Sequence, residues 1–386
     1  MRLIAWTLFI LISTACKAQQ TFTFANAPGP HGVGVRVVEQ FDTTRTFPSA
    51  AGSGRHRPVQ TLVWYPARRG GKPLVYDDYV KLIGSVDNFS RPAVEQRQLV
   101  EADIQGKTEG KADAQVAKAR AQRMWAVPDA PPAPGKFPTV IYAPSISGDS
   151  FQNADLCEYL ASHGYVVLAS PSLGTDQRDQ TLDLKDIETQ TADIRFLITH
   201  AASLPQADSS KVAVVSYSAG GLASVFAATQ DKRITALVQL DGSVRYFNSL
   251  VRQAGYATAD KVAVPMLYLA HRPLHDAVEN QIKFKADLSG SFINEMQAAD
   301  LYLFNINALD HRDFSSWFIR IREVASFEDY SLAEVSVAYG WMARYVLEFL
   351  NAYAKDDAHA KRFLSARTQD NGVPRHLIEK LIQRQK

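Results

Sequence analysis

Ser218 is the residue of this chain best placed to act as a nucleophile. It lies in the run Val212-Ala213-Val214-Val215-Ser216-Tyr217-Ser218-Ala219-Gly220-Gly221, which continues into small and apolar residues over 222–228. The pattern predicts a buried parallel strand, a sharp turn and a helix packed on the sheet. A turn of this kind strains the serine backbone, exposes its hydroxyl, and needs small residues two positions before and two after. Ser216 and Gly220 meet that need, although Ser216 departs from the usual Gly-x-Ser-x-Gly motif; a plain Ser/Gly turn is the alternative.

A serine hydroxyl needs a base to take its proton, and His311 is the histidine best placed for this role. It follows the apolar run 301–306 by the short loop 307–310. The catalytic groups of an open α/β sheet gather at the carboxyl ends of its strands, where Ser218 is also expected. Other downstream histidines fit less well: His271 could cap its own strand, and His359 lies among charged residues near the C-terminus. A surface histidine in a loop is the alternative for His311.

Two aspartates could orient the base. Asp241 directly follows the apolar run 235–240 and precedes Gly242, which suits a tight turn at the end of a strand. Asp276 comes six residues after the run 266–270, so it requires a longer loop. An acid in this role holds the tautomer of the imidazole and stabilises the imidazolium. The residues favour Asp241 and leave Asp276 open.

The elements around these residues alternate between strands and helices. Runs 32–39 and 60–65 predict two strands that pair antiparallel, and runs 139–143, 166–170, 212–215, 235–240, 266–270 and 301–306 predict further short strands. Helical patterns at 155–163 and 187–200 separate some of them. The alternation predicts an α/β fold with a doubly wound, mostly parallel sheet and helices on both faces.

Two segments interrupt the alternation. Residues 92–124, within an insertion at about 88–127, predict two helices that Gly106 separates; a solvated helical insertion is favoured over a substrate lid. The second segment, 275–297, lies where an insertion can shape an acyl pocket. With C-terminal helices expected from about residue 330, we expect one domain over residues 19–386.

The first 18 residues predict a signal peptide. Arg2 precedes an apolar run over 3–12, and small residues lead to Ala18, so cleavage there would release a mature chain beginning at Gln19. Cys16 could instead carry a lipid, but a lipobox prefers a bulky aliphatic residue three positions earlier, where Ser13 stands. We therefore expect export to the periplasm or the extracellular space, without stable membrane insertion.

Composition limits the partners. Of 386 residues, 46% are hydrophobic and 21% charged, and the formal net charge of +2 falls to zero without Arg2 and Lys17. A chain without excess positive charge gives no reason to expect a nucleic-acid partner. Cys157 is the only cysteine left after residue 18, so no intramolecular disulfide can form.

The chain resembles the α/β-hydrolases, and among them the platelet-activating-factor acetylhydrolase and dienelactone-hydrolase-like esterases. The resemblance covers about residues 60–313 and depends on Trp64-Tyr65-Pro66, the segment 160–167, Leu240-Asp241-Gly242 and His311-Arg312-Asp313-Phe314. It implies a triad of Ser218, Asp241 and His311, because the acid of the acetylhydrolase branch follows the sixth strand. It also implies a secreted serine hydrolase that cleaves carboxylic esters of small molecules or acylated polymers through an acyl-enzyme.

The same resemblance implies an oxyanion hole made by two backbone N–H groups. These would belong to Ala219 and Ile146, with Ser145 as the substitute for Ile146, since Pro144 has no N–H to donate. No metal or other cofactor is expected, because the chemistry needs none and no set of ligands has suitable spacing. A peptidase or acyltransferase with the same triad, and an inactive binding protein of this fold, are the alternatives.

Overall fold

The computed structural model describes residues 21–48, 55–108, 113–271, 292–322 and 329–385. Its strands are β1 (Gly32–Phe47), β2 (Arg55–Ala67), β3 (Ala126–Pro128), β4 (Phe137–Ala143), β5 (Val166–Ala169), β6 (Ala207–Tyr217), β7 (Ile234–Leu240), β8 (Met266–His271), β9 (Leu301–Ile306) and β10 (Ile378–Arg384). The α-helices are α1 (Tyr76–Val80), α2 (Ala93–Thr108), α3 (Asp113–Arg120), α4 (Ala154–Ser162), α5 (Leu184–Ala201), α6 (Gly220–Gln230), α7 (Asn248–Ala254), α9 (Phe292–Glu295), α10 (Ser316–Ile321), α11 (Leu332–Ala354) and α12 (Ala358–Ser365).

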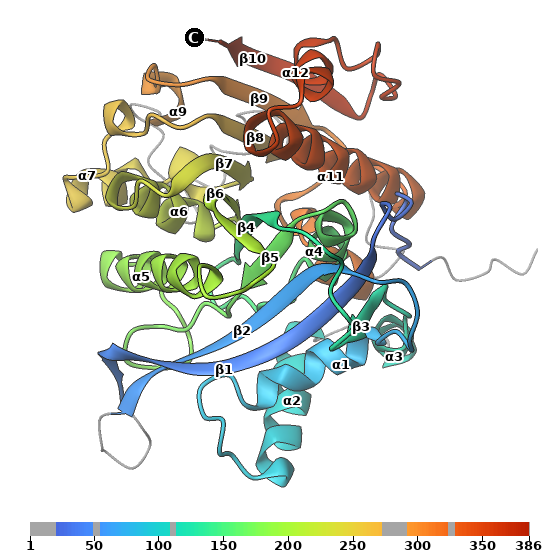
Figure 1. Cartoon of the computed structure of the whole chain (residues 1–386), viewed down its shortest axis with the longest axis vertical. Coiled ribbons are helices and arrows are strands. Elements are labelled where there is room, and N and C mark those ends of the chain that lie inside the picture. Colours follow the sequence, from blue (N-terminus) through green and yellow to red (C-terminus); the bar gives the residue numbers. More distant parts are fainter. Residues whose placement is uncertain (1–20, 49–54, 109–112, 272–291, 323–328, 386) are drawn as a thin grey trace, which may run out of the picture.

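All ten strands form one sheet, in the order β10-β9-β8-β7-β6-β4-β5-β2-β1-β3 (Figure 1). The six strands from β9 to β5 are parallel, and β2 pairs antiparallel with both β5 and β1. The predicted doubly wound, mostly parallel α/β sheet is therefore observed, and it is the α/β-hydrolase fold.

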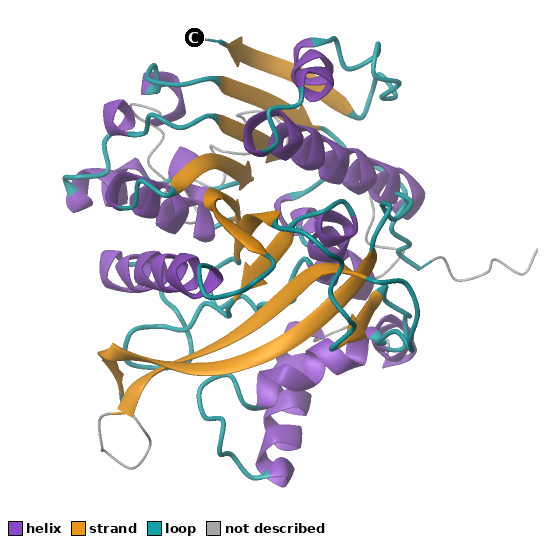
Figure 2. Ribbon diagram, viewed as in Figure 1, coloured by secondary structure: helices purple, strands orange, loops and turns teal. Residues whose placement is uncertain are grey.

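Helices cover both faces of the sheet because the central strands are apolar on both sides (Figure 2). Alternate residues of each strand point to opposite faces. Val140 of β4 and Val215 of β6 share a core with α4 and α11, whereas Ile141 and Val214, one position away, share the opposite core with α5 and α6. The sheet is thus held between two apolar layers.

The chain changes direction in the sheet at β4. This strand lies between β5 and β6, although it precedes both in sequence. The helix after β4, α4, packs on one face, and the helix after β6, α6, packs on the other. Because these connections diverge, a crevice opens at the carboxyl ends of β4 and β6. Ser218 and the loop 144–148 lie at those ends.

The edges of the sheet differ from the prediction. The first hairpin is longer than expected: β1 and β2 extend into the polar stretch 43–57, with an irregular register between Asp42 and Thr46. In this polar stretch, β1 and β2 are held together by backbone hydrogen bonds and not by an alternating apolar pattern. Two further strands were not predicted: β3 pairs parallel with β1, and β10 pairs antiparallel with β9 after the C-terminal helices α11 and α12.

The insertion expected at about 88–127 contains α2 and α3 and ends in β3. Gly106 does not separate the two helices as predicted, because α2 continues through it to Thr108. Among the described residues, no helix is both long enough and apolar enough to cross a membrane. The predicted leader, residues 1–18 with Cys16, lies outside the described residues.

Candidate active site

Ser218 sits on a strained turn between β6 and α6. Its φ of 54° lies in the left-handed region, which a residue with a side chain rarely adopts. A Cβ on Gly220 would lie 2.4 Å from the carbonyl oxygen of Ala143, so this position needs glycine where the helix passes the end of β4. The strain and the close approach are those expected of a nucleophile elbow.

Ser216, the departure from the usual motif, is accommodated by its hydrogen bonds. Its side chain is completely buried, and its hydroxyl donates to the carbonyl of Val238 at 3.0 Å and accepts from the Ser224 hydroxyl at 3.1 Å. A buried hydroxyl is tolerated when it is paired. Serine therefore replaces glycine here without an unpaired polar group.

His311 reaches Ser218 from the loop after β9. Its Nε2 lies 3.0 Å from Ser218 Oγ. The residue begins a short 3₁₀ helix, His311–Phe314, whose start is capped by Asp310 and Asp313, and its carbonyl accepts a hydrogen bond from the Tyr217 hydroxyl at 2.9 Å. The backbone of His311 is thus fixed at the carboxyl edge of the sheet.

Asp241 lies at the end of β7, beside β6, and its side chain is fully buried. Its φ is 45°, and a Cβ on the next residue, Gly242, would lie 1.9 Å from Gln239 Oε1. The Asp-Gly pair therefore makes the tight turn that the sequence predicts. The turn directs the carboxylate toward His311, whose Nδ1 lies 2.5 Å from Asp241 Oδ2.

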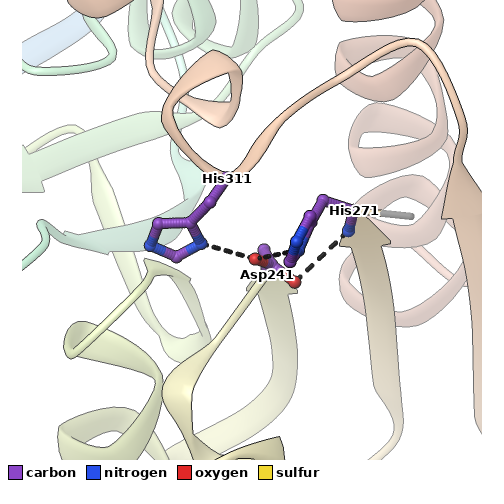
Figure 3. A group of neighbouring side chains, drawn as sticks. All are labelled: Asp241, His271 and His311. Carbon is purple, nitrogen blue, oxygen red and sulfur yellow. Dashed lines mark hydrogen bonds and ion pairs between the residues drawn. The ribbon is translucent and has the colours of Figure 1, made fainter. Parts of the chain in front are cut away.

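A second imidazole also binds this carboxylate. His271 Nδ1 lies 2.8 Å from the same oxygen, and Figure 3 shows Asp241 between the two rings. The other oxygen, Oδ1, accepts from the Tyr246 hydroxyl at 3.0 Å and from the backbone N–H of His271 at 3.3 Å. Burial raises the pKa of Asp241, but His271 and His311 outweigh burial and hold this pKa well below its ordinary value. The carboxylate is therefore ionised.

Sequence reasoning assigned His271 only a capping role at its own strand. Its position in the sheet indicates the contact with Asp241, because His271 ends β8, which lies next to the strand that Asp241 follows. Within the described part of the chain, one group of side chains has the composition of a metal site, namely Asp241, His271 and His311, with ligand atoms within 4.8 Å of one another. In this structure the same atoms are hydrogen-bonded to each other and, through His311, to Ser218.

Several hydrogen bonds hold the loop after β4, and one of them engages the N–H of Ser145. The N–H of Ser145 donates to Gln152 Oε1 at 3.1 Å, so it is not free to act as the substitute donor. The carbonyl of Pro144 accepts from Gln190 at 2.9 Å, and Ser147 exchanges two hydrogen bonds with the backbone of Gln180. Ile146 lines the same cavity as Ser218, and Ala219 directly follows the serine at the start of α6.

A cavity of about 480 Å³ opens over Ser218 and His311. Ile146 and Phe318 supply apolar surface, and the guanidinium of Arg312 stands 4.7 Å from the Phe318 ring centre. Gly106 and Lys107 of α2 also line it, and Lys107 is anchored to Asp149 at 2.6 Å and Asp103 at 2.9 Å. The helical insertion thus forms part of the cavity wall, whereas the sequence favoured a purely solvated insertion.

Other residues singled out from the sequence lie away from this site or outside the described residues. Asp276, the other acid considered, and most of the segment 275–297 lie outside the described residues. Cys157 is a buried free cysteine in the apolar core. Of the predicted site residues, the structure brings together Ser218, Asp241, His311, Ala219 and Ile146.

Comparisons with known proteins agree with this architecture. Residues 124–282 match the model of the dienelactone hydrolase family. A solved ferulic acid esterase from Streptomyces cinnamoneus superposes with a TM-score of 0.62 at 18% identity, covering 93% of this chain and 99% of that chain. A search of curated proteins returned no match. The chain has the α/β-hydrolase fold, and the family match over residues 124–282 supports an ester hydrolase.

Proposed function

We propose that this α/β-hydrolase is a serine hydrolase that cleaves carboxylic esters through an acyl-enzyme intermediate. The observation that carries the proposal is the 3.0 Å approach of His311 Nε2 to Ser218 Oγ, at the floor of an open cavity. A serine held on a strained turn, next to a base that is itself oriented by a buried acid, is the arrangement that nucleophilic catalysis needs.

Ser218 acts as the nucleophile and His311 as the general base. An ionised carboxylate only accepts hydrogen bonds, so the proton of neutral His311 sits on Nδ1, facing Asp241, and Nε2 is left to accept the proton of Ser218. As Oγ attacks the ester carbonyl, that proton moves to Nε2. Asp241 then stabilises the imidazolium that forms.

The imidazolium next returns its proton to the leaving alkoxide, so the C–O bond breaks and the alcohol departs. Water attacks the acyl-enzyme in the same way: His311 takes one proton from the water and gives it back to Ser218 Oγ, which releases the carboxylic acid. The N–H groups of Ala219 and Ile146 stabilise the negative oxygen at each tetrahedral stage. Side chains, two backbone N–H groups and water carry every step.

The substrate of this cavity would be an ester of a small molecule or of an acylated polymer. Its walls combine the apolar side chains of Ile146 and Phe318 with the cations of Lys107 and Arg312. Because the structurally similar protein is a ferulic acid esterase, methyl ferulate belongs in a substrate panel beside p-nitrophenyl esters of increasing chain length. The ester that this panel ranks first defines the acyl preference.

Fluorophosphonate labelling tests the proposal, since only an activated serine reacts quickly with this reagent. Wild type should be labelled and should hydrolyse p-nitrophenyl acetate, and Ser218→Ala should lose both properties while it keeps its fold. Ser216→Ala is the matched control and should be labelled like wild type. Equal labelling of Ser218→Ala and wild type would refute the assignment. Labelling with peptide cleavage or acyl transfer but no ester hydrolysis would point to a peptidase or acyltransferase, and no labelling at all to an inactive binding protein.

The sequence of the first 18 residues supports a second part of the proposal, export as a soluble protein. Arg2, the short apolar run and the Ala18 exit direct cleavage before Gln19. Intact-mass measurement of protein from the native host should give a chain that begins at Gln19. A diacylglyceryl group on Cys16 would contradict this and place the protein on a membrane through a lipid.

A further inference from the structure

His271 is the one described ring that shares an oxygen of Asp241 with His311. Both Nδ1 atoms approach Oδ2, at 2.5 Å for His311 and 2.8 Å for His271, and the two ring centres are 6.0 Å apart (Figure 3). Because an ionised carboxylate has no proton to donate, both rings must donate from Nδ1. The acid is therefore held from two sides by equivalent N–H groups.

The fold fixes this arrangement through three neighbouring strands. Asp241 follows β7, His271 ends β8, and β9 leads to His311, while β8 lies between β7 and β9. The N–H of Asp241 donates to the carbonyl of Leu269 at 2.7 Å, and His271 is in register with Ile306. His271 thus contacts the acid through both its ring and its backbone N–H.

A carboxylate that is fully buried is costly unless donors surround it. His311 supplies only one donor, and its side chain is 40% exposed, so it is the less constrained partner. His271, with a side chain only 9% exposed, is the more rigid one. It can therefore fix the direction of Oδ2, and it also draws part of that oxygen's negative charge away from His311.

We infer that His271 is a positioning residue of the proposed triad: its ring fixes Asp241 Oδ2 against His311 Nδ1 and sets how strongly the acid holds the imidazolium formed during ester cleavage. This inference depends on the proposed function. The described ionisable groups that face the acid from neighbouring elements are His271, His311, the phenols of Tyr217, Tyr246 and Tyr268, and the guanidinium of Arg245.

Two substitutions distinguish the positioning of Asp241 by the His271 N–H donor from simple filling of space by the side chain. His271→Asn keeps an N–H donor, because Asn Nδ2 is as many bonds from Cα as imidazole Nδ1. His271→Leu keeps apolar bulk and removes the donor. His271→Asn should retain kcat for p-nitrophenyl acetate within about fivefold. His271→Leu should lower kcat by about 10- to 100-fold with a change in KM below about threefold, because the freed carboxylate and the His311 ring that it holds can then turn together and take Nε2 out of line with Ser218 Oγ.

The pH profile of kcat/KM distinguishes this role from a structural one. Without the competing donor, Asp241 holds the His311 imidazolium more strongly. The midpoint of the acid limb should therefore move upward in His271→Leu, by about half a pH unit or more. In His271→Asn, which keeps the donor, the midpoint should stay closer to that of wild type.

His359→Leu, on the exposed face of α12, is the control and should match wild type in both measurements. If His271→Leu does not fold, His271→Gln replaces it, because its amide nitrogen lies one bond too far out. Equal activity of the Asn and Leu variants, or a loss of kcat without a shift of the midpoint, would overturn the inference. Ser218→Ala assayed alongside keeps the tests separate: an active Ser218→Ala overturns the proposed function itself.

Discussion

Replacing Asp241 by asparagine tests the proposed acid most directly. The two oxygens of Asp241 accept from four donors: the Nδ1 atoms of His311 and His271 at Oδ2, and the Tyr246 hydroxyl and the His271 N–H at Oδ1. An amide has one oxygen and one NH₂ group. Whichever way it is oriented, the NH₂ group faces donors that the carboxylate satisfied.

Each orientation has its own cost. With the amide nitrogen at the Oδ2 position, both rings must accept there, so their protons move to Nε2, and His311 can no longer take a proton from Ser218. With the nitrogen at the Oδ1 position, the buried N–H of His271 is left unpaired, at about 1–3 kcal/mol. In both cases the charge that stabilises the imidazolium is lost. We expect kcat to fall about 10⁴-fold, or roughly 5 kcal/mol of barrier.

The assay is kcat on p-nitrophenyl acetate, with fluorophosphonate labelling rates measured in parallel and unfolding by urea as the folding control. Asp310→Asn is the matched control, because this aspartate directly precedes His311 but is 43% exposed and lies 3.3 Å from Arg322. The kcat of Asp310→Asn should fall by less than about tenfold. A folded Asp241→Asn that keeps more than a tenth of the wild-type kcat would refute the reasoning. So would an inactive Asp276→Asn, which would return the acid to the loop after β8.

Three further outcomes are expected. Ser216→Ala removes a hydroxyl that is paired to Val238 and Ser224, so it should cost about 1 kcal/mol of unfolding free energy, measured in urea, and leave kcat unchanged. Because His311 must be neutral to act as a base, kcat/KM should rise with pH and then level off; a flat profile from about pH 5 to 8 would exclude a histidine base. Burial raises the pKa of Glu158 from 4.5 to about 7, so the folded protein binds this proton more tightly than the unfolded chain does, and the free energy of unfolding should fall as pH rises through that interval. The fall should be roughly 3 kcal/mol between about pH 4.5 and 7, and urea unfolding of Glu158→Gln should lack most of it.

The central part of the fold was predictable because its strands are buried on both faces. Short apolar runs such as 212–215 and 235–240 are typical of strands buried inside a parallel sheet. The turns after these two runs contain Ser218 and Asp241-Gly242. The order of these runs predicted the parallel sheet. It also placed Ser218, Asp241 and His311 at one edge, where the structure has them.

The edges were less predictable because backbone pairing, rather than a residue pattern, creates them. β3 has three residues and lies next to proline-rich chain, and β10 reads Ile-Glu-Lys-Leu-Ile-Gln-Arg, which a helix could equally accommodate. His271 was underestimated for a related reason. A histidine at a strand end is common, and only the register of β7, β8 and β9 brings its ring to Asp241.

Because of the position of α2, the wall of the cavity can vary in sequence independently of the proposed catalytic residues. The helix comes from the connection between β2 and β3, on the antiparallel side of the sheet, yet its Gly106 and Lys107 reach the cavity over Ser218. The proposed nucleophile and one wall of the cavity above it therefore belong to stretches of sequence more than a hundred residues apart. Exchange of the insertion between relatives could give new ester preferences in one step, with the chemical machinery inherited unaltered.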